Sequence, residues 1–430
     1  MDGISKGKIN TIRCAGFDDE QNTAVVFQNF CEGEIMAQYT LKKAFKFLKF
    51  KDFANIFICL FVMPFALIAK IFIRDFWLVC EEEKEARDNG YWFYKWVREN
   101  HPKQKIAYAI NKKSIDYNKV ADLGKVIQYG SLSHWFWYIV ADKNISSQKG
   151  GKPNAAVCYL FEVVFKMRKN NRVFLQHGVT VNKGEWLFYK NTNVRLFITA
   201  TQQEYEFIRE HFGYPEDNVK LLGFSRFDQL QDIEIDKDMI LVMPTWRNWL
   251  ARESNDNNGL EFDKTEYFNK WNEIMNSKEL DELLKKYDKH ILFYPHRNMQ
   301  KFLSYFSTDS ERIKIADWKE YDIQDVLKKA ALMITDYSSV FFDFAYMLKP
   351  VIFYQFDEDE FRAKQYSEGY LDYHNTSLGK WTDSLDGVLK YLENSLKESI
   401  PRVKEEDIKE DFPMRDNNNS KRIYDAIKSI

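Results

Sequence analysis

The chain has 430 residues, 45% of them hydrophobic and 29% charged, which is typical of a globular protein rather than a disordered one. This length accommodates two domains with separate cores. A net charge of −2 excludes a polycation that binds nucleic acid along its whole length. The cysteines form no Cys-x-x-Cys motif and no Cys/His cluster, so we expect reduced thiols in a cytosolic compartment and no metal site. They are Cys14, Cys31, Cys59, Cys80 and Cys158.

The first 74 residues differ in character from the rest, and residues 1–40 are an extension to which the sequence assigns no role. Over residues 41–49, apolar and lysine side chains segregate to opposite faces of a helix, as in helices that lie on anionic lipid. The apolar run Ile56–Ala69 follows, and with its neighbours it is just long enough to span a bilayer. A single span would place the following domain, with its thiols, outside the cell. We therefore favour peripheral, monotopic attachment of residues 41–74 to the inner leaflet over a true span or a buried core helix.

After residue 74, short apolar runs alternate with amphipathic segments, a pattern typical of α/β proteins with doubly wound parallel sheets. We expect one Rossmann-like domain over residues 75–222 and a second over residues 223–405. Residues 406–430 are expected to form a C-terminal helix that packs back on the first domain. The expected strands are Phe76–Val79, Lys105–Ile110, Val126–Gln128, Arg172–Leu175, Arg195–Thr199, Val219–Leu222, Met239–Met243, His290–Phe293, Ala331–Ile334 and Val351–Phe356.

Polar motifs follow four of these strands, and the carboxyl ends of parallel strands are the usual ligand position in open α/β sheets. Two such domains facing each other would enclose a cleft lined by these motifs. The motifs are Gln176-His177-Gly178, Pro244-Thr245-Trp246-Arg247, Pro295-His296-Arg297 and Thr335-Asp336-Tyr337-Ser338-Ser339.

The last motif is the most informative, because it reads as strand, polar turn and helix. Ser338 or Ser339 is a suitable N-cap for a helix that we expect to run to Leu348. The free N–H groups and the dipole of a helix start favour a phosphate or pyrophosphate. The alternative is an ordinary turn in which the serines only cap the helix.

The four motifs together suit transfer from a nucleotide diphosphate donor to an alcohol. Such a reaction benefits from a histidine base, for which His177 is the candidate. Charge on the phosphoryl oxygens would be stabilised by His296, Arg247, Arg297 and the serine turn. Each residue also has a structural alternative: a histidine bonded to a carbonyl, or an arginine in an ion pair.

Seven motifs in order make the chain resemble the CDP-glycerol glycerophosphotransferase family, which includes teichoic acid polymerases, primases and their capsule relatives. The resemblance runs from about Phe76 to Arg422. Its motifs are Glu85-Ala-Arg-Asp-Asn-Gly-Tyr91, His177-Gly178, Gly223-x-x-Arg226-x-Asp228, Thr245-Trp246-Arg247, Pro295-His296, Ile334-Thr-Asp-Tyr-Ser-Ser-Val-Phe-Phe-Asp343-Phe-Ala and Asp416…Ser420-x-Arg422.

The resemblance implies a GT-B-like enzyme whose two domains face a cleft, the first binding the acceptor and the second the nucleotide donor. It would move glycerol phosphate or ribitol phosphate from a CDP-polyol to a hydroxyl of a lipid-linked acceptor and release CMP, without a metal or other cofactor. This would take place at the cytoplasmic face of the cell membrane. The implied catalytic residues are His177 and His296, with Gly178 and Thr245 in support. The expected donor-binding residues are Arg247, Arg297, Thr335, Asp336, Ser338, Ser339 and Asp343.

Two other functions remain open on the sequence alone. A GT-B glycosyltransferase that uses a nucleotide sugar would share the cleft and the serine turn. A non-catalytic, membrane-bound partner in polymer assembly would keep the fold without the reaction. A homo-oligomer is compatible with the sequence, and Arg226 and Asp228 are expected to pair with each other near the domain junction. Gln176 stands where the family commonly has tryptophan, and such departures leave the polyol and the acceptor undetermined.

Overall fold

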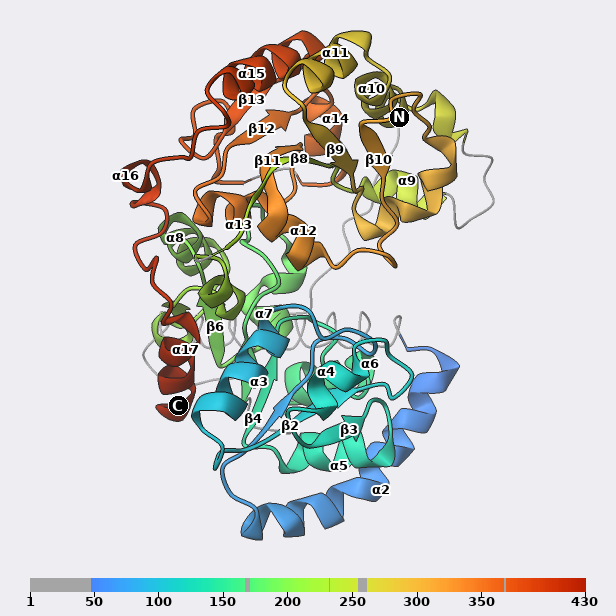
Figure 1. Cartoon of the computed structure of the whole chain (residues 1–430). Coiled ribbons are helices and arrows are strands. Elements are labelled where there is room, and N and C mark those ends of the chain that lie inside the picture. The colour runs from blue at the N-terminus through green and yellow to red at the C-terminus, as the bar shows by residue number, and fades with distance from the viewer. Residues whose placement is uncertain (1–47, 167–170, 232, 254–260, 367–368) are drawn as a thin grey trace, which may run out of the picture.

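Two parallel sheets organise the chain in the computed structural model, which describes residues 48–166, 171–231, 233–253, 261–366 and 369–430. Each sheet is the centre of one lobe, and the lobes lie one above the other in Figure 1. Helices cover both faces of each sheet, so the expected architecture of two doubly wound α/β domains is confirmed.

The N-terminal lobe contains a seven-stranded sheet in the order β3-β2-β1-β4-β5-β6-β7. Alternate residues of its strands point to opposite faces. Trp77 and Val79 join a core with α3, while Phe76 and Leu78 join one with α5. The strands are β1 (Phe76–Val79), β2 (Lys105–Ile110), β3 (Val126–Gln128), β4 (Lys143–Ser146), β5 (Arg172–Phe174), β6 (Leu196–Thr199) and β7 (Val219–Leu221). The helices are α3 (Asn89–Asn100), α4 (Tyr117–Ala121), α5 (Leu132–Val140), α6 (Ala155–Tyr159), which continues as the π-helix η1 (Leu160–Val164), α7 (Tyr189–Thr192) and α8 (Gln202–His211), with the short 3-10 turns η2 (Glu185–Leu187) and η3 (Glu216–Asn218).

The C-terminal lobe repeats the arrangement with a six-stranded parallel sheet in the order β10-β9-β8-β11-β12-β13. In both lobes the strand order reverses beside the first strand, between β1 and β4 and between β8 and β11, which is the topological switch point of doubly wound sheets. The strands are β8 (Asp236–Met243), β9 (His290–Phe293), β10 (Ile313–Ile315), β11 (Ala330–Thr335), β12 (Val351–Tyr354) and β13 (Lys380–Thr382). The helices are α9 (Asn248–Glu253), α10 (Glu266–Met275), α11 (Lys278–Lys286), α12 (Ile323–Lys329), α13 (Phe341–Tyr346), α14 (Glu358–Lys364), α15 (Leu385–Lys397) and α16 (Glu405–Ile408), with the 3-10 segments η5 (Phe262–Lys264) and η6 (Arg297–Tyr305).

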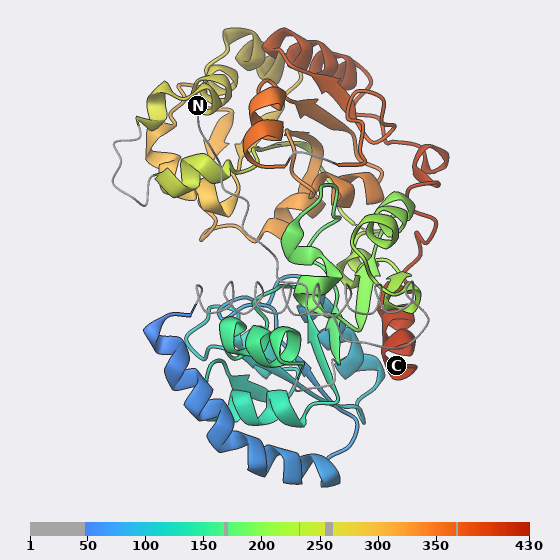
Figure 2. The ribbon, with the colours of Figure 1, turned by 180° about the vertical axis from the view of Figure 1, so that it is seen from behind.

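The chain crosses between the lobes twice. The first crossing contains the 3-10 helix η4 (Ser225–Gln229), and the second leads to α17 (Asn419–Lys428). Ile423 and Ile427 of α17 are fully buried in the core of the N-terminal lobe, and α17 lies beside that lobe in Figures 1 and 2. Ile408 of α16, by contrast, belongs to the core of the C-terminal lobe.

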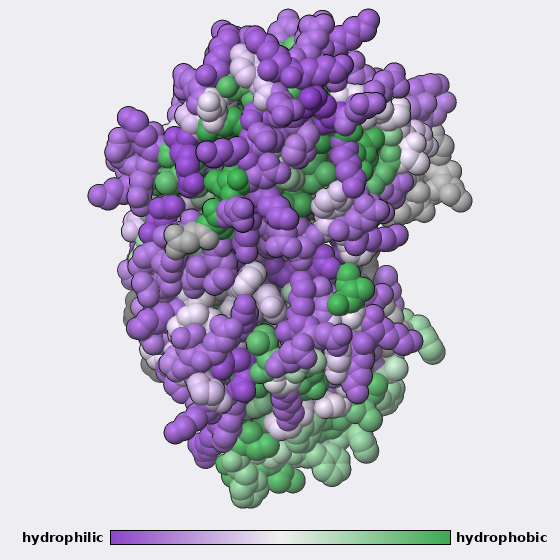
Figure 3. Space-filling view, in the orientation of Figure 1, coloured by the Kyte–Doolittle hydropathy of each residue, from purple (hydrophilic) through white to green (hydrophobic). Residues whose placement is uncertain are grey.

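The helix α2 (Phe50–Phe72) lies along the outside of the N-terminal lobe (Figure 2). Cys59, Val62 and Ala66 on one face are buried against α5. The opposite face exposes large apolar side chains, which form the green band at the base of Figure 3. Residues Asp52–Phe72 are long and apolar enough to cross a membrane, by length and composition. The expected basic stretch at residues 41–47 lies outside the described residues.

Candidate active site

Four of the expected site residues meet between the lobes. A cavity of about 190 Å³ and an adjoining cavity of about 410 Å³ are both lined by His177, His296, Ser338 and Ser339. His177 follows β5 of the N-terminal lobe, whereas His296 follows β9 and the serines follow β11 of the C-terminal lobe. The carboxyl ends of the two sheets therefore face each other across this cleft, as the sequence motifs predict.

The loop that carries His177 is fixed by buried polar groups. Gln176 has a positive φ of 63°, which turns the chain sharply at the end of β5. The amide of Gln176 donates to Glu204 Oε1 at 2.8 Å, and the Thr180 N–H donates to the same oxygen at 2.7 Å. Asn89 Nδ2 donates to the Gln176 carbonyl at 2.6 Å. These hydrogen bonds fix the residues on both sides of His177. The helices α3 and α8 therefore determine the position of His177.

His177 is neutral at physiological pH. The His177 side chain is exposed to the cleft, but desolvation by the surrounding protein lowers its pKa to about 4, and the positive charge of Arg226 acts in the same direction. A hydrogen bond to the backbone of Ser147 opposes this shift of the pKa only in part. A neutral ring that donates one N–H keeps its second nitrogen as an acceptor.

His296 has the complementary character of a donor. Its Nδ1 accepts a hydrogen bond from the Asn298 N–H at 3.2 Å, which leaves Nε2 to carry the proton of the neutral ring. Burial lowers the pKa of His296 to about 4, while the carboxylate of Asp336 raises it and the neighbouring His177 lowers it further. The ring is near-parallel to that of Trp246, with 6.1 Å between the ring centroids.

The serine turn differs from the expected capped helix. The helix α13 begins at Phe341 and ends at Tyr346, so the expected span from the serines to Leu348 is wrong. Its N-cap is Val340, and neither serine side chain caps it. Among the described residues, the N–H groups of Ser338, Ser339 and Val340 have no protein acceptor. Three free N–H groups beside the cavity are an anion-binding arrangement that does not depend on the short helix.

Gly178 brings the two lobes into close approach. A Cβ atom at this position would lie 2.7 Å from Ser339 Oγ of the other lobe. The absence of a side chain therefore lets the loop after β5 approach the serine turn.

Arg247 and Asp336 lie behind the cavity wall instead of facing a donor. Arg247 is fully buried, and its guanidinium pairs with Asp336 at 2.8 Å and with Asp357 at 2.7 Å. Asp336 Oδ1 in turn accepts the N–H groups of Thr245 and Tyr337, each at 2.8 Å. The expected contact of Arg247 and Asp336 with the donor is thus wrong, since both are held in ion pairs that shape the loops after β8 and β11.

Thr335 and Asp343 are also turned away from the cleft. The hydroxyl of Thr335 donates to the Met243 carbonyl at 2.6 Å and is buried within the sheet. Asp343 is fully buried and accepts two hydrogen bonds from Arg226, at 2.7 and 2.8 Å. Direct donor contacts by these two residues are therefore corrected to supporting positions. Thr245 does line the smaller cavity.

Arg297 faces the larger cavity and also reaches across the cleft. Its guanidinium lies over the Trp318 ring at 4.4 Å from the centroid and pairs with Glu85 of the opposite lobe. Arg297 thus remains exposed to a ligand while it contributes to lobe contact.

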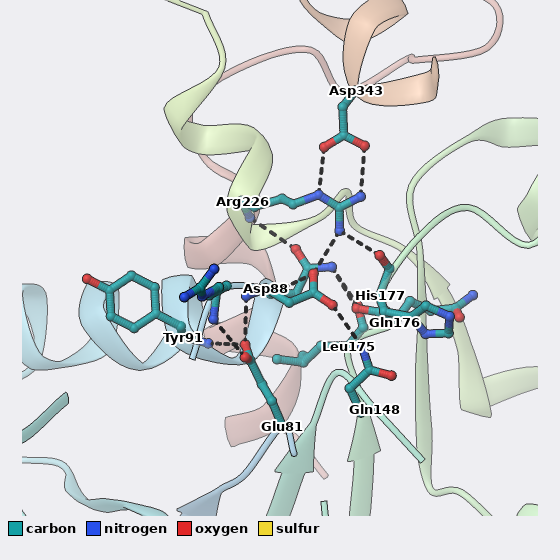
Figure 4. A network of polar contacts seen from close by, with 11 residues as sticks. Glu81, Asp88, Tyr91, Gln148, Leu175, Gln176, His177, Arg226 and Asp343 are labelled. Carbon is teal, nitrogen blue, oxygen red and sulfur yellow. Dashed lines mark hydrogen bonds and ion pairs between the residues drawn. The ribbon is translucent and has the colours of Figure 1, made fainter. Parts of the chain in front are cut away.

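Arg226 is the central residue that the sequence motifs did not place at the site (Figure 4). It pairs with Asp343 of the C-terminal lobe and with Asp88 of the N-terminal lobe at 3.0 Å, and it donates to the His177 carbonyl at 3.2 Å. The expected pair between Arg226 and Asp228 is wrong, because Asp228 accepts the Asn419 and Ser420 N–H groups instead. The signal was present in the motifs at residues 85–91 and 223–228, whose residues were not expected at the site.

Asp88, which pairs with Arg226, lies near a second buried carboxylate, Glu81. Burial raises the pKa of Glu81 to about 8 and that of Asp88 to about 6, and Arg226 opposes the shift at Asp88. Glu81 accepts the N–H groups of Arg87, Asp88 and Tyr91, and so fixes the start of α3. No group of His, Cys, Asp and Glu side chains suited to a metal ion occurs in the part of the chain that the structure describes.

Comparison with known proteins decides the family. Residues 67–429 match the model of the CDP-Glycerol:Poly(glycerophosphate) glycerophosphotransferase family. The chain belongs to this family. The match spans both lobes and the returning helix α17, so the glycerophosphotransferase family is defined over the complete two-lobed unit.

Two curated relatives and one solved structure illustrate this membership of the glycerophosphotransferase family. The chain is 31% identical over 377 residues to the minor teichoic acid biosynthesis protein GgaB of Bacillus subtilis (strain 168), covering 83% of this chain and 40% of that protein. It is 21% identical over 338 residues to a teichoic acid poly(glycerol phosphate) polymerase of Staphylococcus epidermidis, covering 72% of this chain and 44% of that protein. The matched region thus spans less than half the length of either relative. The structure of the wall teichoic acid polymerase TagF superposes with a TM-score of 0.60 at 15% identity, covering 92% of this chain and 98% of that one, which shows the shared fold.

Proposed function

We propose that this protein transfers glycerol phosphate or ribitol phosphate from a CDP-polyol to a hydroxyl of a lipid-linked acceptor and releases CMP, in the synthesis of a teichoic acid-type polymer. The observation that carries the proposal is the meeting of His177 from one lobe with His296, Ser338 and Ser339 from the other. Membership of the glycerophosphotransferase family supports this reaction over transfer of a sugar or a non-catalytic role.

In the proposed reaction, His177 removes the proton of the acceptor hydroxyl as its oxygen attacks the phosphorus next to the polyol. A new O–P bond forms, the bond between this phosphorus and the CMP oxygen breaks, and CMP leaves with the electron pair. The proton on His177 then passes to solvent. His177 is neutral at physiological pH because its pKa is near 4, so no prior deprotonation is needed.

Negative charge on the phosphoryl oxygens would be met by donors of the C-terminal lobe. His296 and the residues with free N–H groups, 338–340, line the larger cavity together, and His296, Ser338 and Ser339 also line the smaller one. Preorganised donors of this kind stabilise a transition state without having to reorient.

Cavity size suggests how the donor is divided between the two spaces. Small-molecule sites occupy roughly 300–1,000 Å³, so the cavity of about 410 Å³ suits the nucleoside and the one of about 190 Å³ suits the polyol and the acceptor hydroxyl. Trp318 and Arg297 give the larger cavity an aromatic ring and a cation for a cytidine ribophosphate.

The exposed face of α2 supports a peripheral location at the inner leaflet. Phe57, Phe61 and Phe65 on this face are 72%, 66% and 59% exposed. The other face is tied to the lobe, since Asn154 donates to Asp52 at 2.8 Å and Trp135 donates to Asn55 at 3.1 Å. A helix bound along its length lies in the plane of a membrane more readily than it crosses one.

Identification of the nucleotide donor tests the proposed phosphotransfer most directly. Thermal unfolding in the presence of CDP-glycerol, CDP-ribitol, UDP-glucose or GDP-mannose should show stabilisation by a CDP-polyol alone, because a ligand stabilises only the state that binds it. CMP release in the presence of membranes should then be abolished in His177→Ala, whereas His296→Ala should also weaken donor binding. Stabilisation by a nucleotide sugar would favour a glycosyltransferase, and stabilisation by none of the four would favour the non-catalytic role.

A further inference from the structure

A second cavity lies away from the histidines, between α2 and the N-terminal lobe. Its volume is about 740 Å³, within the range of roughly 300–1,000 Å³ for small-molecule sites. Lys143 at the start of β4 and Arg195 just before β6 line this cavity. It therefore lies at the amino ends of the strands, opposite the sheet edge that carries His177.

The lining of this cavity is divided into an apolar part and a charged part. Cys59, Met63 and Leu67 of α2 face Trp135 and Ile139 of α5 in the apolar part. The charged part lies one turn further along α2, at Lys70, and continues to Asp142, Lys143 and Arg195. A ligand that matches both parts has an apolar chain and a charged head.

The charged lining contains three cations, Lys70, Lys143 and Arg195, and two carboxylates, Asp142 and Glu162. Glu162 is paired with Lys152 at 3.3 Å. Lys70 pairs with Asp142 at 3.6 Å, and Lys143 donates to a backbone oxygen of Ile430, which also lines the cavity, so both lysines already have partners. Arg195 donates to Asn218 Oδ1 at 3.0 Å, but it forms no ion pair with any residue that the structure describes. A guanidinium without a carboxylate partner at the end of an apolar cavity is suited to a phosphate.

The cavity adjoins the apolar outer surface of α2. Leu67 lines the cavity and is also 53% exposed, so it belongs to both surfaces. An acyl chain could therefore pass from a lipid leaflet into the cavity around the edge of α2. The continuity of the cavity with the outer surface of α2 and the charge of Arg195 indicate an occupant with an acyl chain and an anionic head group.

We propose that the cavity binds one acyl chain of an anionic membrane phospholipid, whose phosphate is held by Arg195 with Lys70 and Lys143. The site is distinct from the reaction cleft and goes beyond the proposed phosphotransfer. A lipid-linked acceptor is a less suitable occupant, because its reacting hydroxyl must reach His177 at the opposite edge of the sheet.

The test uses the full chain, reconstituted with vesicles of phosphatidylcholine and phosphatidylglycerol, re-extracted in detergent and examined by native mass spectrometry. We expect one retained phosphatidylglycerol per chain. Met63→Trp fills the cavity and should reduce retention at least tenfold, whereas Phe61→Trp, which adds an indole to the outer face of the same helix, should leave it unchanged. Arg195→Gln should abolish the preference for phosphatidylglycerol over phosphatidylcholine, and Arg209→Gln on the exposed side of α8 should not.

Equal retention by wild type and Met63→Trp would overturn the proposal. So would selective retention of a polyprenyl phosphate from a mixed vesicle, because the occupant would then be the lipid carrier. Retention only after removal of residues 1–47 would show that the chain itself fills the cavity, and this also contradicts lipid binding. None of these measurements depends on phosphotransfer, so the proposed reaction can fail while this site stands.

Discussion

At the scale of single residues, the two histidines differ in which ring nitrogen is engaged rather than in the pKa. Both rings have a pKa near 4 because the surrounding protein disfavours their charged forms. His296 uses Nδ1 to accept the Asn298 N–H and so presents a proton to the cleft, whereas the neutral His177 retains a nitrogen that can accept one. The same lowering of the pKa keeps both rings neutral, so that one ring can donate a hydrogen bond and the other retains a nitrogen that can accept a proton.

The pH dependence of catalysis follows from the low pKa of His177. Protonation removes the base, so titration of His177 should leave activity unchanged between pH 6 and 8 and lower it as the pH drops through about 4–5. The nearby carboxyl groups of Asp88 and Glu81, with pKa values of about 6 and 8, are separated from this effect by repeating the profile in Glu81→Gln. The measurement is CMP release from the CDP-polyol as a function of pH, with circular dichroism as a control for unfolding in acid. An inflection at or above pH 6.5, with the fold intact, would contradict this assignment.

Gly178 offers a second test at this scale. Alanine would place a Cβ 2.7 Å from Ser339 Oγ, so in Gly178→Ala this hydroxyl must turn away or the loop must shift, and the rate of CMP release should fall by up to about tenfold. In a Ser339→Ala background the same substitution should cost less, because the colliding oxygen is absent. Equal losses in the two backgrounds would show that the close approach is not the cause.

At the scale of elements, most strands were predictable from their apolar residues, whereas β4, β10 and β13 were missed. The expected strands at Phe76–Val79, Lys105–Ile110 and His290–Phe293 agree with β1, β2 and β9 residue for residue. The sequence did not reveal β4, which is Lys-Asn-Ile-Ser, although it lies in the middle of its sheet. Its Asn144 and Ser146 are buried, and Asn144 Nδ2 and Ser146 Oγ donate to the backbone carbonyls of Tyr138 and Gln148. Tertiary contacts of this kind are invisible to a hydrophobic pattern.

The site was predictable to a similar degree. Strand ends located His177, His296, Ser338 and Ser339 correctly within one cleft, because parallel topology brings those ends together. The same reasoning could not distinguish Arg297, which lines the cleft, from Arg247, which is buried beneath it. Side-chain direction depends on the acidic partners Asp336 and Asp357, and the latter is 110 positions away in sequence.

Glu204 of α8 holds the loop that carries His177, so a substitution of Glu204 should lower the stability of the protein. Both oxygens of Glu204 accept N–H groups, from Gln176, Thr180 and Ala200. In Glu204→Gln an NH2 group replaces one of these oxygens, so at least one N–H donor loses its acceptor. We expect a loss of about 1–3 kcal/mol in the free energy of unfolding, measured with urea. The control is Glu206→Gln on the exposed side of the same helix, which should change the free energy by less than about 0.5 kcal/mol.

The outer face of α2 predicts membrane binding that can be separated from stability. Replacing Phe57, Phe61 and Phe65 together by serine should abolish flotation with anionic vesicles, because their burial in lipid would be lost. The thermal midpoint should not fall, since these side chains are exposed. Tyr305→Ser, in the other lobe, controls for loss of an exposed aromatic ring. Undiminished flotation of the triple variant would argue against α2 as the attachment surface.

At the scale of the whole molecule, the two lobes are joined through charged groups as well as through the chain. Arg226 links Asp88 of one lobe to Asp343 of the other, and Lys119 and Asp322 form an exposed pair at 3.2 Å across the cleft. Only the first of these is buried. We therefore expect Arg226 to determine how the lobes are set relative to each other, and the exposed pair to contribute little.

Substitution of Arg226 tests this difference. Arg226→Met leaves Asp343 buried without a partner and should lower the free energy of unfolding by about 3–5 kcal/mol, whereas Lys119→Met should cost less than about 1 kcal/mol. The double variant Arg226→Met, Asp343→Leu should recover part of the loss, because an apolar pair leaves no isolated charge. Comparable costs for Arg226→Met and Lys119→Met in urea unfolding would refute this ranking.

The position of α17 has a consequence for biosynthesis. Ile423 and Ile427 complete an apolar core that Trp77 begins, so the lobe made first stays unfinished until about two hundred residues beyond the end of β7 have been translated. During that interval the nascent polypeptide carries an uncovered apolar strip beside Trp77, where exposed surface invites aggregation or chaperone binding. A chain that ends after β13 but before residue 419 would contain both sheets, but the core of its N-terminal lobe would remain uncovered. Such a chain would be a target for cellular quality control.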